Sequence, residues 1–173
     1  MLHFNKLGDQ GGEAVAASTA FPMLQTLSLS HNNLGAEGLR ALVASANVAT
    51  LKSLNVSFNK LGDEGAKALG ADAMKIQALE RLSLRKTGLT AQGVEALVAS
   101  TKMKHLRELN VRQNALQADG AKVLAASPNV ASLQSLDLGL NKLGDAGVKA
   151  LVTSQALLKL QTLILYWNDI EVE

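Results

Sequence analysis

The stretch from Leu51 to Leu69, LKSLNVSFNKLGDEGAKAL, contains the pattern that decides the fold. In its first half, Leu54 and Val56 alternate with polar residues that include Asn55 and Ser57, which predicts a strand with one buried and one outward face. Its second half, GDEGAKAL, is made of helix-forming residues with apolar positions three and four apart, which predicts a short helix. One strand followed by one helix forms a single supersecondary unit.

The same phrase recurs along the chain. Its six copies begin at Leu24, Leu51, Leu79, Leu106, Leu133 and Leu160. The leucines are 27 residues apart, except for one step of 28 between Leu51 and Leu79. A fixed period of this length is typical of repeat proteins in which each unit packs on its neighbours. We therefore predict parallel strands side by side in one elongated domain over residues 1–173.

Most copies of the phrase end in asparagine. A buried amide both donates and accepts hydrogen bonds, so it can satisfy backbone groups of the turning chain in its own and adjacent units. We predict a structural ladder of these asparagines: Asn5, Asn32, Asn59, Asn114, Asn141 and Asn168. Thr87 replaces asparagine in the third full unit, where we expect a weaker rung or a bridging water.

Other positions of the unit also recur. A glycine inside a helix costs about 1 kcal/mol relative to alanine, so its repetition predicts that helix and sheet approach too closely for a side chain. These glycines are Gly38, Gly65, Gly93, Gly120 and Gly147. An apolar column is expected to close the core before each strand: Phe21, Val48, Ile76, Met103, Val130 and Leu157. Asp63 and Asp145 are expected at helix starts, where the helix dipole stabilises negative charge.

The combined pattern, LxxLxLxxNxLGxxGxxAL, resembles leucine-rich repeats of the ribonuclease-inhibitor-like subclass, and the resemblance covers essentially the whole chain. It implies a curved α/β solenoid (horseshoe) of about six full repeats plus a truncated first one, with a parallel β-sheet on the concave face and helices on the convex face. It also implies that a partner, usually a protein, binds the concave sheet or the adjoining loops. Activators of Ran-type GTPases are among the members of this subclass.

Composition excludes several other functions. The formal net charge of +2 is too small to indicate nucleic acid or a membrane surface through bulk electrostatics. The chain has no cysteine, which excludes disulfides and thiolate chemistry and favours a reducing, cytoplasmic location. The first residues do not form a signal peptide, and no apolar run approaches the roughly 18 residues that span a bilayer. Without metal-ligand spacing or a nucleophile motif, we expect no enzyme activity, metal or cofactor.

The ends of the sequence suggest a further expectation. The first residues align with the middle of a strand, and the last come before a final helix. Terminal repeats of a solenoid normally cover the open sheet edge and core. We therefore expect a segment of a longer repeat protein, with end-to-end self-association as the alternative.

Binding residues are expected at the outward strand positions. The central units contribute a basic cluster with one nearby acid: Arg81, Arg85, Lys86, Arg112 and Glu108. Parallel strands lie about 4.8 Å apart, so Arg85 and Arg112 are expected to be close neighbours that an anion or an acidic partner would stabilise. The alternative is a solvated basic face that Glu108 partly neutralises.

A second candidate surface lies toward the C-terminus. It consists of Leu140, Ile164, Tyr166 and Trp167, and aromatic residues often dominate interface energy. The alternative is that this patch abuts a following repeat. The main hypothesis is a non-catalytic scaffold that binds a protein on its concave face. Two alternatives remain, a regulator of a small GTPase and a binder of a phosphorylated or acidic ligand through the arginines.

Overall fold

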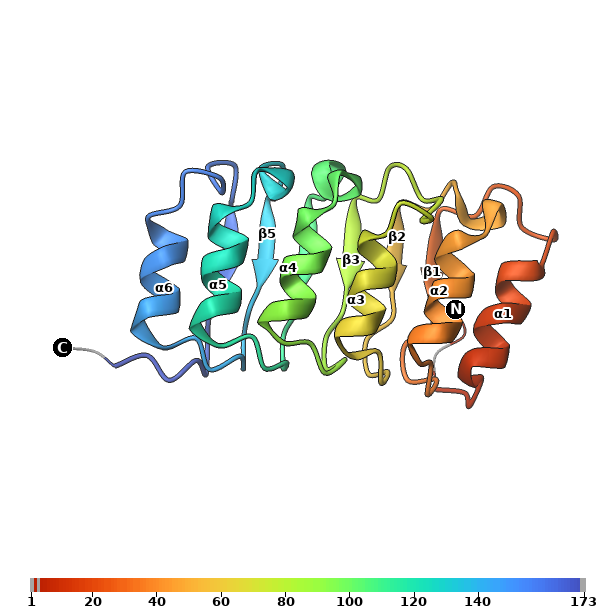
Figure 1. The fold of residues 1–173 in the computed structure, drawn as a ribbon, viewed down its shortest axis with the longest axis horizontal. Helices are drawn as coiled ribbons and strands as arrows, with labels where there is room; N and C mark the ends of the chain where they lie inside the picture. Colours follow the sequence, from red (N-terminus) through yellow and green to blue (C-terminus); the bar gives the residue numbers. More distant parts are fainter. Residues whose placement is uncertain (1, 3, 172–173) are drawn as a thin grey trace.

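The computed structural model describes residue 2 and residues 4–171. Within these residues, six short strands form one parallel sheet in chain order, and the α-helices lie along one face of it (Figure 1). The strands are β1 (Thr26–Ser28), β2 (Ser53–Asn55), β3 (Arg81–Ser83), β4 (Glu108–Asn110), β5 (Ser135–Asp137) and β6 (Thr162–Ile164). This arrangement confirms the predicted α/β solenoid.

Each strand from β1 to β5 is followed by an α-helix on the opposite side of the unit, and α1 precedes β1. The α-helices are α1 (Gly8–Ala17), α2 (Ala36–Ala44), α3 (Gly62–Gly70), α4 (Ala91–Ala99), α5 (Gln117–Ala126) and α6 (Gly144–Val152). Three 3₁₀ helices precede strands in the part of the chain that is described: η1 (Ala46–Val48), η2 (Thr101–His105) and η3 (Pro128–Val130). The core lies between the sheet and the α-helices.

The strand register follows directly from the repeat. The middle residue of every strand is a leucine, and adjacent leucines are paired across the sheet: Leu27, Leu54, Leu82, Leu109, Leu136 and Leu163. All of these except the partly buried Leu163 belong to the buried core. Burying a leucine side chain contributes about 1.5–3 kcal/mol, so the repeated leucines fix which face of each strand points inward.

One predicted core position differs in the structure. Phe21 does not close the core, because 57% of it is exposed, whereas Val48, Ile76 and Met103 at the equivalent positions are buried. Ser57 lies in an outward row as expected but has little exposed surface, and its hydroxyl forms a hydrogen bond of 2.7 Å with Ser83 Oγ of the next repeat.

The recurring glycines are explained by helix neighbours rather than by the sheet. A Cβ on Gly38 would lie 2.6 Å from the Cα of Asp9 in the preceding helix, and a Cβ on Gly147 would lie 3.2 Å from Ala118 Cα. A Cβ on Gly65 would lie 2.6 Å from the Cβ of Leu61, four residues earlier. The prediction of a close approach was therefore correct, but the surface approached was wrong.

Aspartates at the helix starts link neighbouring repeats. Asp63 Oδ1 accepts a hydrogen bond from the backbone N–H of Thr90, and its Oδ2 accepts one from the Thr90 hydroxyl. Asp9 Oδ1 likewise accepts from the N–H groups of Gly35 and Gly38. Each carboxylate therefore satisfies orphan donors at the start of the next helix, a contact that the single-helix dipole argument did not anticipate.

The ladder asparagines are of two kinds. Each of Asn59, Asn114 and Asn141 donates its amide N–H groups to carbonyls of its own and the preceding repeat. Asn59 Oδ1 accepts from the N–H groups of Asn32 and Leu34 in the preceding repeat. The Oδ1 atoms of Asn32 and Asn141, in contrast, are buried without a partner among the described residues.

Thr87 occupies the same kind of rung as Asn32 and Asn141, two repeats away from each. Its hydroxyl donates to Leu84 O of its own repeat at 2.7 Å, rather than to the preceding repeat. The side-chain oxygens of Asn32 and Asn141 accept no hydrogen bond from a described residue. Threonine at this position therefore removes one hydrogen bond to the preceding repeat and leaves no N–H group without its acceptor. This explains why the substitution is compatible with an intact sheet.

Candidate functional site

The outward side chains of the sheet form parallel rows, one residue per repeat. The strand-start row consists of Thr26, Ser53, Arg81, Glu108, Ser135 and Thr162, and the strand-end row consists of Ser28, Asn55, Ser83, Asn110, Asp137 and Ile164. Two residues further along each repeat lies the third row: Ser30, Ser57, Arg85, Arg112, Gly139 and Tyr166. The edge row follows it: Phe4, His31, Phe58, Lys86, Gln113, Leu140 and Trp167.

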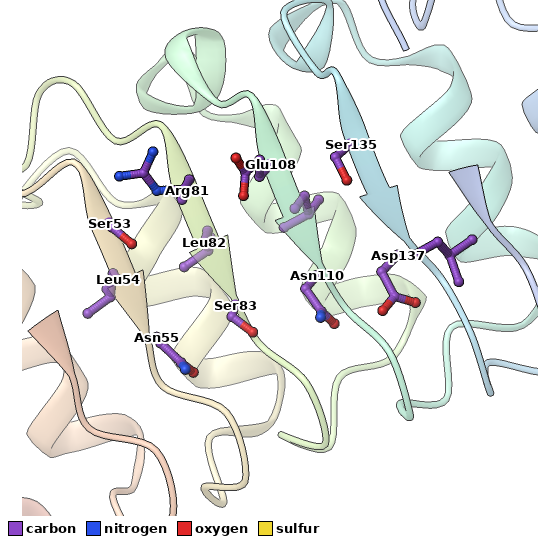
Figure 2. Close-up of a pocket in the computed structure, with 12 residues that line it drawn as sticks. Ser53, Leu54, Asn55, Arg81, Leu82, Ser83, Glu108, Asn110, Ser135 and Asp137 are labelled. Carbon is purple, nitrogen blue, oxygen red and sulfur yellow. The ribbon is translucent and has the colours of Figure 1, made fainter. Parts of the chain in front are cut away.

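The middle residues of the first two rows line a hollow of about 340 Å³ on the sheet face. Figure 2 shows Arg81 and Glu108 on neighbouring strands at one end of it, and Asn110 and Asp137 at the other. Arg81 and Glu108 are Cα partners, so the structure brings these two predicted residues together. Ile164 also lines the hollow, whereas Ser135, Asn110 and Asp137 were not singled out from the sequence because serine, asparagine and aspartate are ordinary at strand ends.

Arg85 lies against an aromatic ring of the preceding repeat. Its guanidinium carbon is 4.7 Å from the centre of the Phe58 ring, and Lys86 Nζ is 5.9 Å from the same centre. Cation–π contacts of this kind contribute about 0.5–1 kcal/mol at exposed sites. Arg85 Nε is buried and has no hydrogen-bond partner among the described residues, so the stacking contact is what orients the guanidinium.

Arg112 lies against an aromatic ring on the C-terminal side. Its guanidinium carbon is 4.8 Å from the centre of the Tyr166 ring, two repeats away. The repeat between them carries Gly139, where a Cβ would lie 2.9 Å from Tyr166 Cζ. The missing side chain at Gly139 therefore leaves the space that the tyrosine ring occupies.

The arginines are thus arranged differently from the expectation. Arg85 and Arg112 sit at adjacent places in the third row, but their guanidinium groups stack on rings that lie in opposite directions along the sheet. Mutual repulsion is reduced because the charges diverge, and no bridging anion is needed to explain the arrangement. Glu108 forms no salt bridge with either arginine among the described residues.

The residues of the edge row have an unusual backbone conformation. Each of its described residues has a φ of 50–60°, a left-handed conformation that costs non-glycine residues about 1–3 kcal/mol. Backbone hydrogen bonds to the next repeat maintain it, as from Phe58 N–H to Arg85 O at 2.7 Å and from Lys86 N–H to Arg112 O at 2.9 Å. These residues therefore project from the sheet edge at regular intervals.

Aromatic residues of the edge row stack on one another. The ring centres of Phe4 and His31 are 4.3 Å apart, and those of His31 and Phe58 are 4.0 Å apart, with the rings nearly parallel. Sequence reasoning did not predict this stack. The signal available was an aromatic or imidazole ring at the same place in successive repeats.

Two aromatic residues of the C-terminal patch are exposed. Trp167 is 76% exposed and Tyr166 is 41% exposed, and their rings meet edge to face with centres 6.4 Å apart. Leu140 lies in the edge row and is half-buried. The structure therefore places Tyr166 with both Trp167 and Arg112, which joins the two predicted clusters into one surface.

Other kinds of site are not found in the described part of the chain. No group of three His, Asp or Glu side chains among residues 2 and 4–171 could hold a metal ion. No helix of the described chain is long and apolar enough to cross a membrane.

Comparison with known proteins identifies the repeat. A profile described as "Leucine Rich repeat" matches residues 22–43, 49–70, 102–125 and 131–152, more than half of the chain. The gap between the second and third matches contains the repeat with the 28-residue step and Thr87. No curated protein matches the chain.

Solved structures share the fold. An internalin from Listeria monocytogenes is similar with a TM-score of 0.59 and 25% identity, over 86% of this chain and 43% of the internalin. The leucine-rich repeat ectodomain of the plant membrane receptor kinase GASSHO1/SCHENGEN3, from Arabidopsis thaliana, gives a TM-score of 0.50 and 24% identity, over 85% of this chain and 16% of the ectodomain. The match thus spans less than half the length of either protein. The chain belongs to the leucine-rich repeat family.

Proposed function

We propose that the sheet face binds another protein without catalysing a reaction, and that this surface runs from the hollow to Tyr166 and Trp167. The observation that carries the proposal is the Arg112–Tyr166 contact across Gly139. Arginine, tyrosine and tryptophan are the residue types that most often dominate interface energy. Stacking holds the arginine and the tyrosine in place before binding, which lowers the entropic cost of association.

The comparisons support a protein-interaction module. The plant receptor ectodomain was solved in complex with CASPARIAN STRIP INTEGRITY FACTOR 2. That observation concerns the receptor, and it supports a similar use of the repeat scaffold here. The partner of this chain is the subject of the experiment below.

Site-specific photo-crosslinking tests the proposal. A photoreactive amino acid replaces Ser53 or Ser135, which line the hollow, and in control variants it replaces Glu64 or Lys122, which are exposed on helices α3 and α5. We expect crosslinks to a distinct protein from the hollow positions and not from the helix positions. Crosslinks that form only from the helices would refute the concave face as the binding surface.

Two finer assignments are also our proposals. We infer that the repeats belong to the ribonuclease-inhibitor-like subclass, because the period is 27 or 28 residues and each strand from β1 to β5 is followed by an α-helix of nine or ten residues. We also propose a cytoplasmic location, which the absence of cysteine supports. Fractionation of the source cells with a tagged chain tests the second assignment.

A further inference from the structure

The edge of the sheet at the carboxyl ends of the strands carries mostly positive charge. We define the carboxyl edge as the third row, the edge row and the residue after each ladder position. Its cations among the described residues are Lys6, Lys60, Arg85, Lys86, Arg112 and Lys142, and its one acid there is Asp169. The salt bridges of the described chain all lie on the α-helices: Arg40–Glu37, Lys67–Glu64 and Lys122–Asp119. The edge cations are therefore not neutralised within the described chain.

The two arginines of this edge are prepared for a planar anion. One guanidinium lies over the Phe58 ring and the other over the Tyr166 ring, which restricts the position of each, and each Nε is buried. Neither Nε has a hydrogen-bond partner among the described residues. A carboxylate matches the paired N–H groups of an arginine fork and forms short, charge-assisted hydrogen bonds with them.

The aromatic rings of this edge distinguish a polypeptide from a nucleic acid. Single-stranded nucleic acids bind by stacking bases on free ring faces. His31 lies between the Phe4 and Phe58 rings, and Arg85 also lies over Phe58. Tyr166 is covered on one side by Arg112. These faces already have partners, so the exposed Trp167 ring at the C-terminal end is the aromatic group of the described edge that stays open to stacking.

The spacing of the arginines indicates the form of the ligand. Arg85 reaches back to Phe58 on the repeat of β2, and Arg112 reaches toward Tyr166, whose ring lies above Gly139 on the repeat of β5. At about 4.8 Å per strand the two charges are separated by roughly 10–14 Å. An extended chain advances about 3.3 Å per residue, and residues an even number apart share one side, so acids about four positions apart would reach both arginines.

We propose that the carboxyl edge binds an extended acidic segment of a partner protein, whose Asp or Glu carboxylates pair with Arg85 and Arg112. This proposal rests on the proposed function, since it names the chemistry of the partner at that surface. The exposed lysines Lys60, Lys86 and Lys142 strengthen the attraction along the flanks. Glu108 and Asp137 lie in the strand-start and strand-end rows, so they keep the acidic segment near the edge and away from the hollow.

Fluorescence anisotropy tests this inference with the full chain. The probe is a labelled synthetic peptide with glutamate at every fourth position and serine elsewhere, and its matched control has glutamine in place of glutamate. We expect the glutamate peptide to bind and the glutamine peptide to bind at least roughly tenfold more weakly, because charge-assisted hydrogen bonds are lost. Binding should also weaken as salt is added.

Variants locate the binding to this edge. Arg85→Gln with Arg112→Gln should weaken binding of the glutamate peptide roughly tenfold or more. Arg107→Gln is the matched control, because Arg107 is exposed just before β4, at the opposite edge, and it should leave affinity unchanged. A Lys60→Gln and Lys142→Gln variant removes two exposed charges, and it should lower both the affinity and the salt dependence even if the arginine variant unfolds.

Three results would overturn the inference: equal binding of the two peptides, equal weakening by the Arg107 control, or tighter binding of a single-stranded oligonucleotide than of the glutamate peptide. The crosslinking experiment separates this failure from failure of the proposed function. If the hollow positions crosslink a protein but the glutamate peptide does not bind, the acidic chemistry is wrong and the binding face remains.

Discussion

The two kinds of ladder asparagine predict different costs for the same substitution. In both Asn114 and Asn141 the side-chain amide donates to three backbone carbonyls. Asn114 Oδ1 also accepts from the N–H groups of Thr87, Gly88 and Leu89, at 2.9–3.0 Å. Asn141 Oδ1 has no partner among the described residues. Replacement by alanine should therefore be more destabilising at Asn114 than at Asn141.

The size of this difference in the free energy of unfolding follows from the backbone groups that each variant leaves without a hydrogen-bond partner. The carbonyls keep a second donor in either variant: Val111 O, for example, accepts from both asparagines, and Leu138 O accepts also from Asn168. The amides of Thr87 and Leu89 lose the acceptor that the structure gives them. A net hydrogen bond is worth about 1 kcal/mol, and an orphaned buried group costs about 1–3 kcal/mol. Because Gly88 is exposed, we expect Asn114→Ala to cost about 2–3 kcal/mol more than Asn141→Ala.

Urea unfolding followed by far-UV circular dichroism measures this difference, and amide exchange locates it. For a chain of this size, 2–3 kcal/mol corresponds to a further drop of roughly 4–12 °C in Tm. Exchange at the Thr87 and Leu89 amides should accelerate in Asn114→Ala. Asn59→Ala controls for position in the array, because Asn59 Oδ1 also accepts two backbone bonds. Equal destabilisation by the Asn114 and Asn141 variants would refute the reasoning.

Three further predictions address the core and the surface. Leu109→Ala should lower the free energy of unfolding by about 2–5 kcal/mol, because it opens a cavity at a residue that is 2% exposed; an unchanged urea midpoint would contradict the register. Thr87→Asn should stabilise the chain by up to about 1 kcal/mol, because the new amide can donate to Val56 O of the preceding repeat. A loss of stability in calorimetry would argue against placing Thr87 in the same kind of ladder position as Asn32 and Asn141. Gly139→Ala should displace the Tyr166 ring, because the new Cβ would lie 2.9 Å from its Cζ, with the fold intact by circular dichroism; unchanged tyrosine ring chemical shifts in NMR would show that the gap is not required.

The repeated phrase determined the architecture because every unit has the same pattern of apolar and helix-forming residues. Period-2 apolar residues and a helical stretch in each copy leave one way to bury the leucines, which is to stack the units in register. For the same reason the central strand leucines and the two kinds of segment were predictable from the sequence. The burial of Phe21 was predicted wrongly: Phe21 belongs to the unit of β1, which pairs with a strand on one side only within the described residues, and the other units do not cover it.

The basic cluster shows which features could be predicted from the sequence and which required the tertiary structure. The sequence placed Arg85 and Arg112 in one row, since the repeat period fixes the position of each Cα. It did not determine the direction of their long side chains, which depends on what lies beside them in other repeats. Phe58, Gly139 and Tyr166 supply those surroundings, and together they turn a predicted repulsion into two separate stacking contacts.

The sequence by itself determined the strand–helix unit, its register and the row in which each outward residue lies, because these depend on local periodicity. Tertiary structure alone decided which neighbours the side chains use across repeats: the Asp63 carboxylate with the next helix, the Asn114 oxygen with the preceding turn, and the stacked rings of the edge row. These contacts join residues about one repeat or more apart. Their geometry is set by the spacing and backbone conformation of adjacent units, which no single repeat encodes.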